Sequence, residues 1–175
     1  MVSSDSEPKE DPRTQMRRRD RQIESEEEII KLLEAGQVGF IATSVHCQPF
    51  LNSNLYWYEA ASHRVYFHTA LQGRTRDNIL ANPRVCFSIG EMGRLLPAET
   101  ALEFSVEYNG VAVFGNARVV EDEAEAEHGL QGLLDKYFPE LEPGKDYRSI
   151  TSEEIERTSV FAIEIESWSG KQKKA

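Results

Sequence analysis

The pattern of apolar and polar positions along the chain predicts more strand than helix. β-branched and aromatic residues are concentrated in six stretches, most of them bounded by residues typical of turns. A period of two, apolar then polar, is clearest in the last stretch and indicates a half-buried strand. We expect strands over 38–45, 50–58, 65–68, 85–89, 104–122 and 160–168.

Helix signals are fewer, and most of them mark where a predicted helix begins or ends. They consist of S/T-x-x-E capping boxes, acidic first turns, apolar residues three or four positions apart, and Gly or Pro stops. One helix should follow Ser25 and end near Gly36, a second should span 74–82, a third 122–137, and one turn should follow Thr151.

The order of these elements predicts the fold class. Strands occur in runs without strand–helix–strand alternation, which favours an antiparallel sheet. Residues 38–45 and 50–58 should form a hairpin, residues 90–100 should form a loop, and Gly110 and Gly115 should bend the long fifth strand. We therefore expect a mainly β protein with flanking helices, built as a six-stranded antiparallel Greek-key barrel.

Length and composition predict one folded domain that follows an N-terminal tail. The chain has 175 residues, enough for one domain with a substantial core. Residues 1–15 are rich in Ser, Pro and charge and almost lack apolar side chains, so we expect a disordered tail there. Residues 16–175 should form the folded domain.

The charge balance excludes several partners. Asp and Glu number 30 against 20 Lys and Arg, giving a formal charge of −10, which opposes binding to nucleic acid or to anionic lipid. No apolar run approaches the roughly 20 residues that would cross a bilayer, and the N-terminus is polar. We expect a cytoplasmic protein with no nucleic-acid or membrane partner, in which Cys47 and Cys86 are reduced.

One basic cluster stands out in this acidic chain. Residues 16–23, MRRRDRQI, contain four arginines. Such a cluster can clamp a phosphate, pair with an acidic surface, or be solvated. We favour pairing or solvation, because charge runs usually form solvated faces.

The most informative stretch is 65–83, where a strand leads through a turn into a helix. A helix N-terminus exposes unpaired N–H groups and the positive end of the dipole. Here Arg74 and Arg76 add two cations and Thr75 adds a hydroxyl. This arrangement suits a phosphate group, although arginines at the start of a surface helix are commonly just solvated.

Polar residues also interrupt the second strand. Asn52, Ser53 and Asn54 lie within an otherwise apolar segment. If they face the interior, their amides need partners, which a bound heteroaromatic ring with carbonyl and nitrogen atoms would supply. On an open sheet face, water would supply them instead.

Seven motifs occur along the chain in a characteristic order. They are RRRDRQI (17–23), VGFIATS (38–44), QPF (48–50), YFHTALQGRTRDN (66–78), NPRVCF (82–87), SVEYNGVAVFG (105–115) and WSGK (168–171). In this order and spacing, they resemble the pyridoxamine 5′-phosphate oxidase-like, FMN-binding split-barrel superfamily, and within it the branch of the 5-nitroimidazole-resistance proteins. The resemblance covers roughly residues 16–174.

The resemblance implies a homodimer with two FMN sites at the subunit interface. It places residues 50–54 beside the isoalloxazine ring, the end of the third strand along the ribityl chain, and the start of the second helix at the phosphate. Two residues near the C-terminus would come from the partner subunit. The implied flavin residues are Leu51, Asn52, Ser53, Asn54, His68, Thr69, Ala70, Gly73, Arg74, Thr75, Trp168 and Lys171.

The chain also departs from the family pattern. Thr75 stands where many relatives carry a lysine, and Ser53 stands where many carry a proline. The C-terminal basic motif of relatives that oxidise pyridoxamine phosphate is absent, so we do not predict that activity.

These observations lead to an expected function with alternatives. We expect an FMN-dependent oxidoreductase that passes electrons to a small aromatic or nitro-bearing acceptor. The flavin would carry the redox chemistry, so no acid–base pair is required. His68 is a candidate proton donor, although a histidine at a strand end is more often structural. The alternatives are a flavin-binding sensor with little turnover and a split-barrel protein that uses haem or a deazaflavin.

We expect no metal site. His46, Cys47, His63, His68 and His128 lack the paired spacing of zinc ligands.

Overall fold

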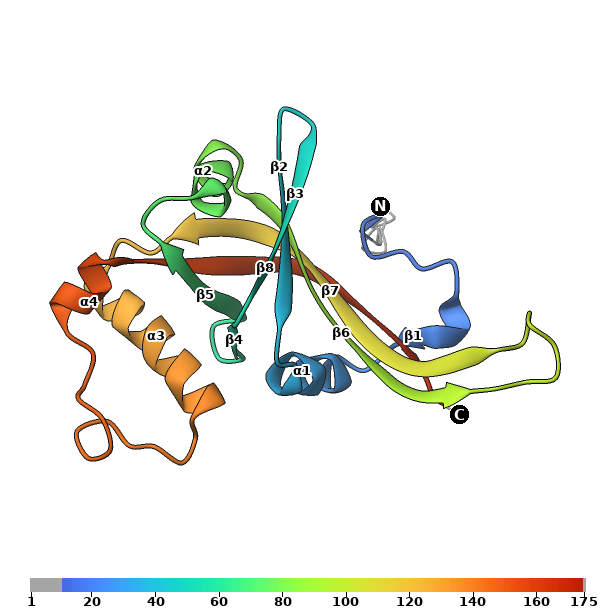
Figure 1. Ribbon diagram of the computed structural model, residues 1–175. Helices are drawn as coiled ribbons and strands as arrows, with labels where there is room; N and C mark the ends of the chain where they lie inside the picture. Colours follow the sequence, from blue (N-terminus) through green and yellow to red (C-terminus); the bar gives the residue numbers. More distant parts are fainter. Residues whose placement is uncertain (1–10, 175) are drawn as a thin grey trace, which may run out of the picture.

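The computed structural model describes residues 11–174, which form one curled antiparallel sheet with helices around it (Figure 1). The strands are β1 (Gln22–Ile23), β2 (Gly39–Val45), β3 (Gln48–Asn54), β4 (Trp57–Glu59), β5 (Arg64–Ala70), β6 (Arg84–Leu96), β7 (Ser105–Val119) and β8 (Thr158–Lys173). The helices are a 3₁₀ turn η1 (Arg19–Arg21), α1 (Glu26–Ala35), α2 (Arg74–Ala81), α3 (Glu123–Tyr137) and α4 (Ser152–Glu156).

The sheet is open. Its order is β3-β2-β6-β7-β8-β5-β4, with β1 paired to β8, and all the strand pairs are antiparallel. Because β3 and β4 stand at the two ends of this order, the sheet does not close on itself. The expected mainly β class with flanking helices is confirmed, but residues 11–174 form eight strands, not six.

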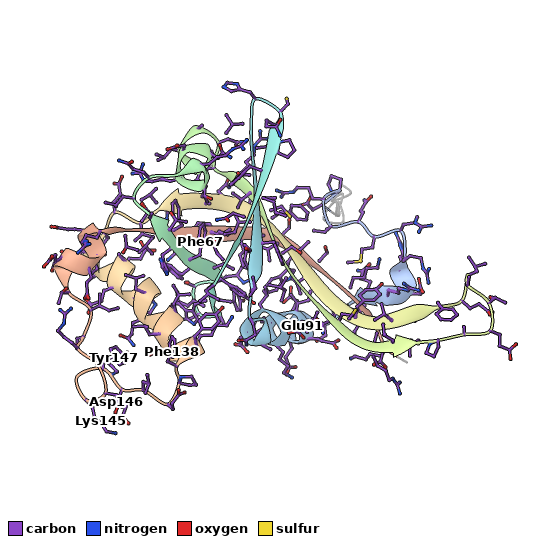
Figure 2. The ribbon with its side chains drawn as sticks, in the orientation of Figure 1. Phe67, Glu91, Phe138, Lys145, Asp146 and Tyr147 are labelled. Carbon is purple, nitrogen blue, oxygen red and sulfur yellow. The ribbon has the colours of Figure 1, made fainter. Side chains whose placement is uncertain are left out.

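The core lies inside the curl of the sheet. Phe67 of β5 stacks on Phe161 of β8 with ring centroids 4.8 Å apart, and both side chains are fully buried. Tyr56 meets Phe87 edge to face at the same distance. Burial of side chains of this size stabilises the fold by about 2–3 kcal/mol each. Figure 2 shows Phe67 within the body of the protein and Tyr147 on the loop that follows α3.

α3 covers the other face of β5 and β8. Tyr66, Val160 and Ala126 form a second buried cluster there. Gly132 is required for this contact, because a Cβ atom at that position would lie 2.1 Å from the ring of Trp57.

The expected helices are confirmed. Ser25 Oγ accepts a hydrogen bond from the N–H of Glu28 at 3.3 Å, and α1 follows. Asp122 caps α3 by accepting from Glu125 N–H at 2.8 Å. The hairpin of β2 and β3 is also confirmed.

Two expected elements were wrong. The stretch 50–58 is not one strand, because Tyr56 turns into the core and its N–H bonds the Tyr137 hydroxyl (3.2 Å) instead of a neighbouring strand. Residues 90–96 are not a loop but the second half of β6, where Gly90 pairs directly with Gly110. The glycines permit close strand approach there, since a Cβ at Gly110 would lie 3.1 Å from the Ile89 carbonyl.

The N-terminal segment is only partly described. Residues 1–10 of the expected disordered tail, and residue 175, lie outside the described residues. Residues 12–14 form a turn, in which Arg13 bonds Asp11 (2.7 Å) and Glu166 of β8 (2.8 Å).

Candidate functional site

Three segments meet beside the β2–β3 hairpin: β3, the end of β5 and the start of α2. Asn52 Nδ2 donates to Asn54 Oδ1 (2.8 Å) and to Thr75 Oγ1 (3.3 Å). Asn54 Nδ2 donates to the carbonyl of His68 (3.0 Å). We call Asn52, Asn54, Thr75 and the His68 carbonyl the polar cluster. The structure thus brings together residues that are up to 23 positions apart in the sequence.

The side-chain amides of Asn52 and Asn54 on β3 find their partners within the polar cluster. The Asn52 amide donates two hydrogen bonds within the cluster and the Asn54 amide donates one, so the protein itself holds both side chains in place. Leu51 and Ser53 alternate with them and are exposed, Leu51 to 61%. β3 is an end strand that pairs with β2 alone among the described strands, which leaves its second backbone edge available for hydrogen bonds.

The N-terminus of α2 lacks a side-chain cap. Gly73 occupies the N-cap position with φ of +150°, a conformation that L-residues rarely adopt, and it has no side chain to bond the first turn. Its carbonyl accepts from Asp77 N–H (3.1 Å), which begins the helix. The N–H groups of the first turn have no acceptor within the helix, and such uncapped helix ends are suited to anions.

The three residues that follow Gly73 have different surroundings. Arg74 Cζ lies 4.6 Å from the centroid of the Phe50 ring, so its guanidinium is held over β3. Thr75 is buried, at 6% exposure. Arg76 Nε is also buried, and no described residue accepts a hydrogen bond from it. An anionic group at this helix end would supply the missing acceptor.

A buried pair that the sequence did not reveal fixes α2 on the sheet. Asn78 Nδ2 donates to Thr43 Oγ1 of β2 at 2.8 Å, and both side chains are buried. The available signal was that Asn78 shares the buried face of α2 with Thr75 and Ile79, where a polar side chain requires a partner.

His68 contributes its backbone to the polar cluster but lines a separate cavity. This cavity, about 270 Å³, lies between the end of β5, α3 and the loop before α4. Burial lowers the pKa of the His68 imidazole, which favours its neutral form. Its walls include His68, Leu130, Leu133, Leu134, Tyr147 and Arg148.

Thr69 and Ala70 end β5 and connect the polar cluster to the turn before α2. Thr69 is half-buried and its hydroxyl donates to the Ala70 carbonyl (2.9 Å), while Ala70 is exposed. Both therefore lie between His68 and Gly73, along the path expected for an elongated ligand.

Trp168 and Lys171 lie far from the polar cluster in the same chain. His68 pairs with Val160 at one end of β8, and Trp168 is eight residues further along, roughly 26 Å away at the usual strand rise. The Trp168 ring lies 4.5 Å from the His63 ring. Lys171 Nζ lies 5.7 Å from the Tyr108 ring centroid. One chain therefore does not bring these two residues to the other predicted site residues.

Within residues 11–174, no three or more His, Cys, Asp or Glu side chains are grouped closely enough to hold a metal ion. No helix in the same range has the length and apolar content needed to cross a bilayer. Cys47 is exposed, Cys86 is half-buried, and both are free thiols.

Comparison with solved structures reveals several similar folds. The flavocytochrome Anf3 of Azotobacter vinelandii superimposes with a TM-score of 0.80 at 23% identity, covering 94% of this chain and 75% of that one. The FAD and haem binding protein of Mycobacterium smegmatis gives 0.77 at 20% identity, covering 89% and 74%. A candidate 5-nitroimidazole antibiotic resistance protein of Bacteroides thetaiotaomicron gives 0.72 at 18% identity, covering 86% of each chain.

Comparison with curated proteins gave no match. The family model described as pyridoxamine 5′-phosphate oxidase matches residues 25–172, which include nearly all of the sheet and all four α-helices. The resemblance inferred from the sequence motifs is confirmed. This chain belongs to the pyridoxamine 5′-phosphate oxidase family.

Proposed function

We propose that this protein binds FMN, with the flavin phosphate at the N-terminus of α2 and the isoalloxazine ring along β3. It would pass electrons from the reduced flavin to a small aromatic or nitro-bearing acceptor. The observation that carries this proposal is the uncapped start of α2, where Gly73, Arg74 and Thr75 adjoin the polar cluster of β3.

The residues present fit a phosphate. The first-turn N–H groups, the Thr75 hydroxyl hydrogen and the Arg74 guanidinium are hydrogen-bond donors that belong to the same helix end. Thr75 Oγ1 already accepts from Asn52, so its own hydrogen remains for an outside acceptor. Arg76 compensates for the lysine found in many relatives, and its buried Nε needs an acceptor.

The residues present also fit a planar polar ring. The free backbone edge of β3 can match ring carbonyl and nitrogen atoms, while Leu51 offers an apolar surface at its side. When bound, the flavin supplies the redox chemistry, and the chain supplies position and electrostatics. The polar cluster limits the movement of Asn52 and Asn54, so little side-chain entropy is lost on binding.

We propose that the protein acts as a homodimer. Trp168 and Lys171 are separated from the polar cluster by roughly 26 Å or more along β8. They can therefore contribute to the flavin site only if they come from a second copy of the chain. The expected mass in light scattering is twice that of the chain. A monomer that binds FMN with full affinity would overturn this part of the proposal. We also assign the protein to the cytoplasm, where its free thiols would remain reduced.

The phosphate assignment is tested by comparing FMN with riboflavin, which has no phosphate. Arg74→Ala should weaken FMN binding by about ten-fold or more, because a charge-assisted hydrogen bond is lost, and should leave riboflavin binding unchanged. Arg94→Ala is the matched control, since it removes an exposed arginine that pairs with Glu107 on the β6–β7 hairpin. It should affect neither ligand.

Three outcomes would contradict the proposal. A purified protein that is colourless and binds no added FMN at micromolar concentration would exclude it. Equal losses for FMN and riboflavin in Arg74→Ala would place the arginine at the ring. If the protein prefers FAD or a deazaflavin, the location of the site stands but FMN is not the cofactor. Turnover of a nitro compound with a reduced nicotinamide donor separates an enzyme from a flavin sensor.

A second candidate function is haem binding, and the cavity beside His68 favours it. Its leucine walls are apolar, His68 would supply an imidazole to the haem iron, and Arg148, which pairs with Glu154 at 2.8 Å, would also pair with a propionate. A haem-binding relative of the same fold adds support. Titration with haemin should give a Soret band that His68→Ala removes and His46→Ala, at the exposed hairpin tip, retains. Absence of a Soret band in the wild type would exclude this candidate.

A further inference from the structure

Residues 11–16, which precede the basic cluster of the N-terminal segment, lie against β8. Their charged side chains reach two neighbouring residues of that strand. Arg13 Nη1 donates to Glu166 at 2.8 Å, and the Ser167 hydroxyl donates to the Asp11 carboxylate at 2.7 Å. We call residues 11–16 the strap.

A β-bulge in β8 makes both of these contacts possible. Phe114 of β7 pairs with Ser167, whereas the next residue, Gly115, pairs with Ile165, so Glu166 is an extra residue in β8. A bulge interrupts the alternation of side chains along a strand. Glu166 and Ser167 therefore both reach the strap, although they are consecutive in the strand.

Within the strap, Asp11 and Arg13 bind each other. The Asp11 carboxylate accepts from Arg13 Nη2 at 2.7 Å and from the Arg13 backbone N–H at 2.9 Å. These hydrogen bonds hold the pKa of the Asp11 carboxyl well below its usual range. Arg13 Cζ also lies 5.6 Å from the centroid of the Phe114 ring of β7. Because Asp11 stays ionised at neutral pH, salt and not a proton is the condition that weakens these contacts.

The strap extends to the part of β8 that we assign to the flavin site of a second copy. Met16, its last residue, lines a cavity of about 300 Å³ together with Tyr108, Ser169 and Lys171. Lys171 is one of the two residues that can contribute to that flavin site only from a second copy. The strap and a second copy cannot occupy the same part of β8 at the same time.

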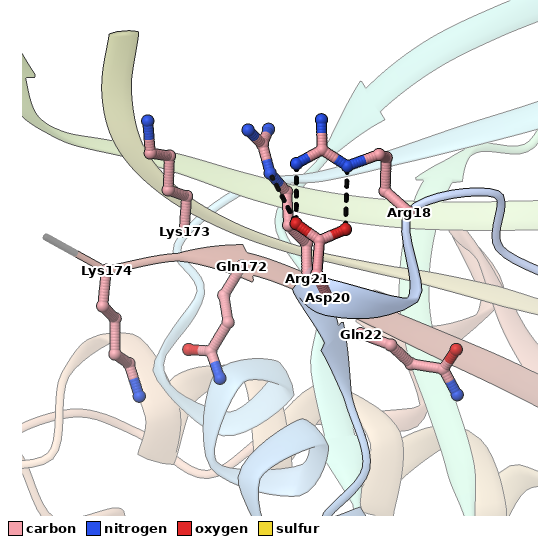
Figure 3. A pocket seen from close by; sticks show the side chains of 7 residues that line it. All are labelled: Arg18, Asp20, Arg21, Gln22, Gln172, Lys173 and Lys174. Atoms are coloured by element: carbon pink, nitrogen blue, oxygen red, sulfur yellow. Dashed lines mark hydrogen bonds and ion pairs between the residues drawn. The ribbon is translucent and has the colours of Figure 1, made fainter.

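The chain that follows the strap is firmly held. Asp20 accepts from Arg18 Nε at 2.8 Å and lies 3.9 Å from Arg21 Nε (Figure 3). Arg21 Nη1 donates to the Tyr108 hydroxyl (3.1 Å), and β1 then pairs with β8. The basic cluster therefore anchors the base of the strap, so the strap can leave the sheet without disturbing β1.

The strap itself is held by weaker interactions. The side chains of Arg13 and Glu166 are each 44% exposed. Exposed ion pairs contribute little to stability, and salt weakens them further. A segment held in this way exchanges between docked and released states.

We propose that the strap is an autoinhibitory segment, which competes with a second copy of the chain for β8 beside Lys171. While the strap is docked, the second copy cannot reach Lys171 and the flavin site lacks that residue. If the strap is docked in about two thirds of the chains, and both copies must release it, the apparent dissociation constant of the dimer is raised about ten-fold. This inference rests on the proposed homodimer and its shared flavin site.

The test compares the full wild-type chain with Arg13→Ala, which removes the contacts to Glu166 and Asp11. Hydrogen exchange of the strap measures its release without any flavin, and the Thr14 N–H, which donates to the Asp11 carbonyl (2.9 Å), is the reporter. Sedimentation equilibrium of the FMN-free chain measures the dissociation constant of the dimer. We expect faster exchange in Arg13→Ala and a dissociation constant about ten-fold lower. FMN should also bind more tightly, because more flavin sites are complete at a given concentration.

Two further variants separate strap release from other effects. Lys31→Ala is the matched control, since it removes an exposed ion pair within α1, from Lys31 Nζ to Glu27 at 2.6 Å. It should change neither exchange nor association. Glu166→Gln removes the charge that Arg13 meets on β8 and should act in the same direction as Arg13→Ala. The double variant should show little more than either single effect, because both changes remove the same ion pair.

Several outcomes would overturn this inference. Faster exchange in Arg13→Ala with an unchanged dissociation constant would show that the strap does not compete with association. A weaker dimer in Arg13→Ala would make the strap a part of the interface. Unchanged exchange in both Arg13→Ala and Glu166→Gln would show that this ion pair does not hold the strap. All three results leave the homodimer proposal in place, whereas chains that stay monomeric at every concentration, in the wild type and in Arg13→Ala, would overturn both.

Discussion

The helix N-termini of this protein are built in two different ways. α1 and α3 begin with Ser25 and Asp122, whose side chains accept from first-turn N–H groups, and both continue with glutamates. In α4, Glu154 accepts from the N–H of Thr151 (3.0 Å). α2 begins with Gly73, has no side-chain cap, and places two arginines in its first turn.

The two kinds of helix start have different roles: capped starts stabilise the fold, whereas an uncapped start leaves N–H groups for a ligand. A side-chain cap stabilises a helix by about 1 kcal/mol, and an acidic first turn adds roughly 0.3–1 kcal/mol through the dipole. α2 has no cap, and Arg74 and Arg76 place like charge near the positive end of its dipole, where Asp77 is the one acidic residue of the first turn. Such an arrangement is favourable when an outside anion completes the site. We therefore interpret the start of α2 as a ligand site and the other three as structural ends.

Reversing the charge at α2 should have the largest effect. Arg74→Glu should weaken FMN binding about 100-fold, because attraction to the phosphate becomes repulsion. The free energy of unfolding should change by less than about 1 kcal/mol, since an acidic first turn suits the dipole. Fluorescence titration of FMN and urea denaturation measure the two quantities.

The opposite change at α3 is the matched control. Glu123→Arg, also at the first helical position, should lower the free energy of unfolding by about 0.5 kcal/mol and leave FMN binding unchanged. If both substitutions weaken FMN binding equally, the distinction between the two kinds of helix end is wrong.

Removing one hydroxyl from α2 should have a smaller effect. Thr75→Val keeps the shape of the buried side chain but removes the donor that we assign to the phosphate. It also removes the acceptor of the longer Asn52 hydrogen bond (3.3 Å), while the bond from Asn52 to Asn54 (2.8 Å) remains and still holds the β3 side chains. FMN affinity should fall about ten-fold, whereas riboflavin affinity should change little. Thr75→Ser retains the hydroxyl and should behave like the wild type. An equally weak Thr75→Ser would show that the methyl group, not the hydroxyl, matters.

Removing a structural cap should affect stability alone. Asp122→Ala leaves Glu125 N–H without its acceptor and should lower the free energy of unfolding by about 1 kcal/mol. FMN affinity should stay unchanged. Asp122→Asn, which can still cap, should recover most of the loss. A change in FMN affinity that exceeds the change in stability would contradict the assignment.

The features that the sequence could predict are those whose interacting residues are close together in the chain. Capping at Ser25, Asp122 and Thr151 depends on residues three positions away, so short motifs contain the whole interaction. The β2–β3 hairpin is local in the same sense. Family motifs supplied the fold and the group of residues around Asn52 and Thr75.

The features that the sequence did not reveal depend on distant partners. Gly90 belongs to a strand only because Gly110 lies opposite it on β7. Tyr56 leaves the strand because its side chain packs in the core and its N–H donates to the Tyr137 hydroxyl. The Asn78–Thr43 pair joins residues 35 positions apart. The basic residues near the N-terminus could not be assigned from sequence, because their partners on β8 lie about 150 positions away.

The smallest expected effect is a pH dependence that α4 shows and α2 does not. Hydrogen bonds from the backbone N–H and hydroxyl of Thr151 lower the pKa of Glu154 below its ordinary 4.5. A carboxyl group with a lowered pKa in the folded state stabilises the fold above the ordinary value, and this contribution is lost as the pH falls through the folded-state pKa. The amide chemical shift of Thr151 should therefore change below pH 4.5, and Glu154→Gln should remove that change. No described carboxylate bonds the first-turn N–H groups of α2, so the Arg74 amide should show no matching change until the protein unfolds. A change of equal size at Arg74 would mean that a carboxylate also caps α2, which would remove the reason for assigning a phosphate there.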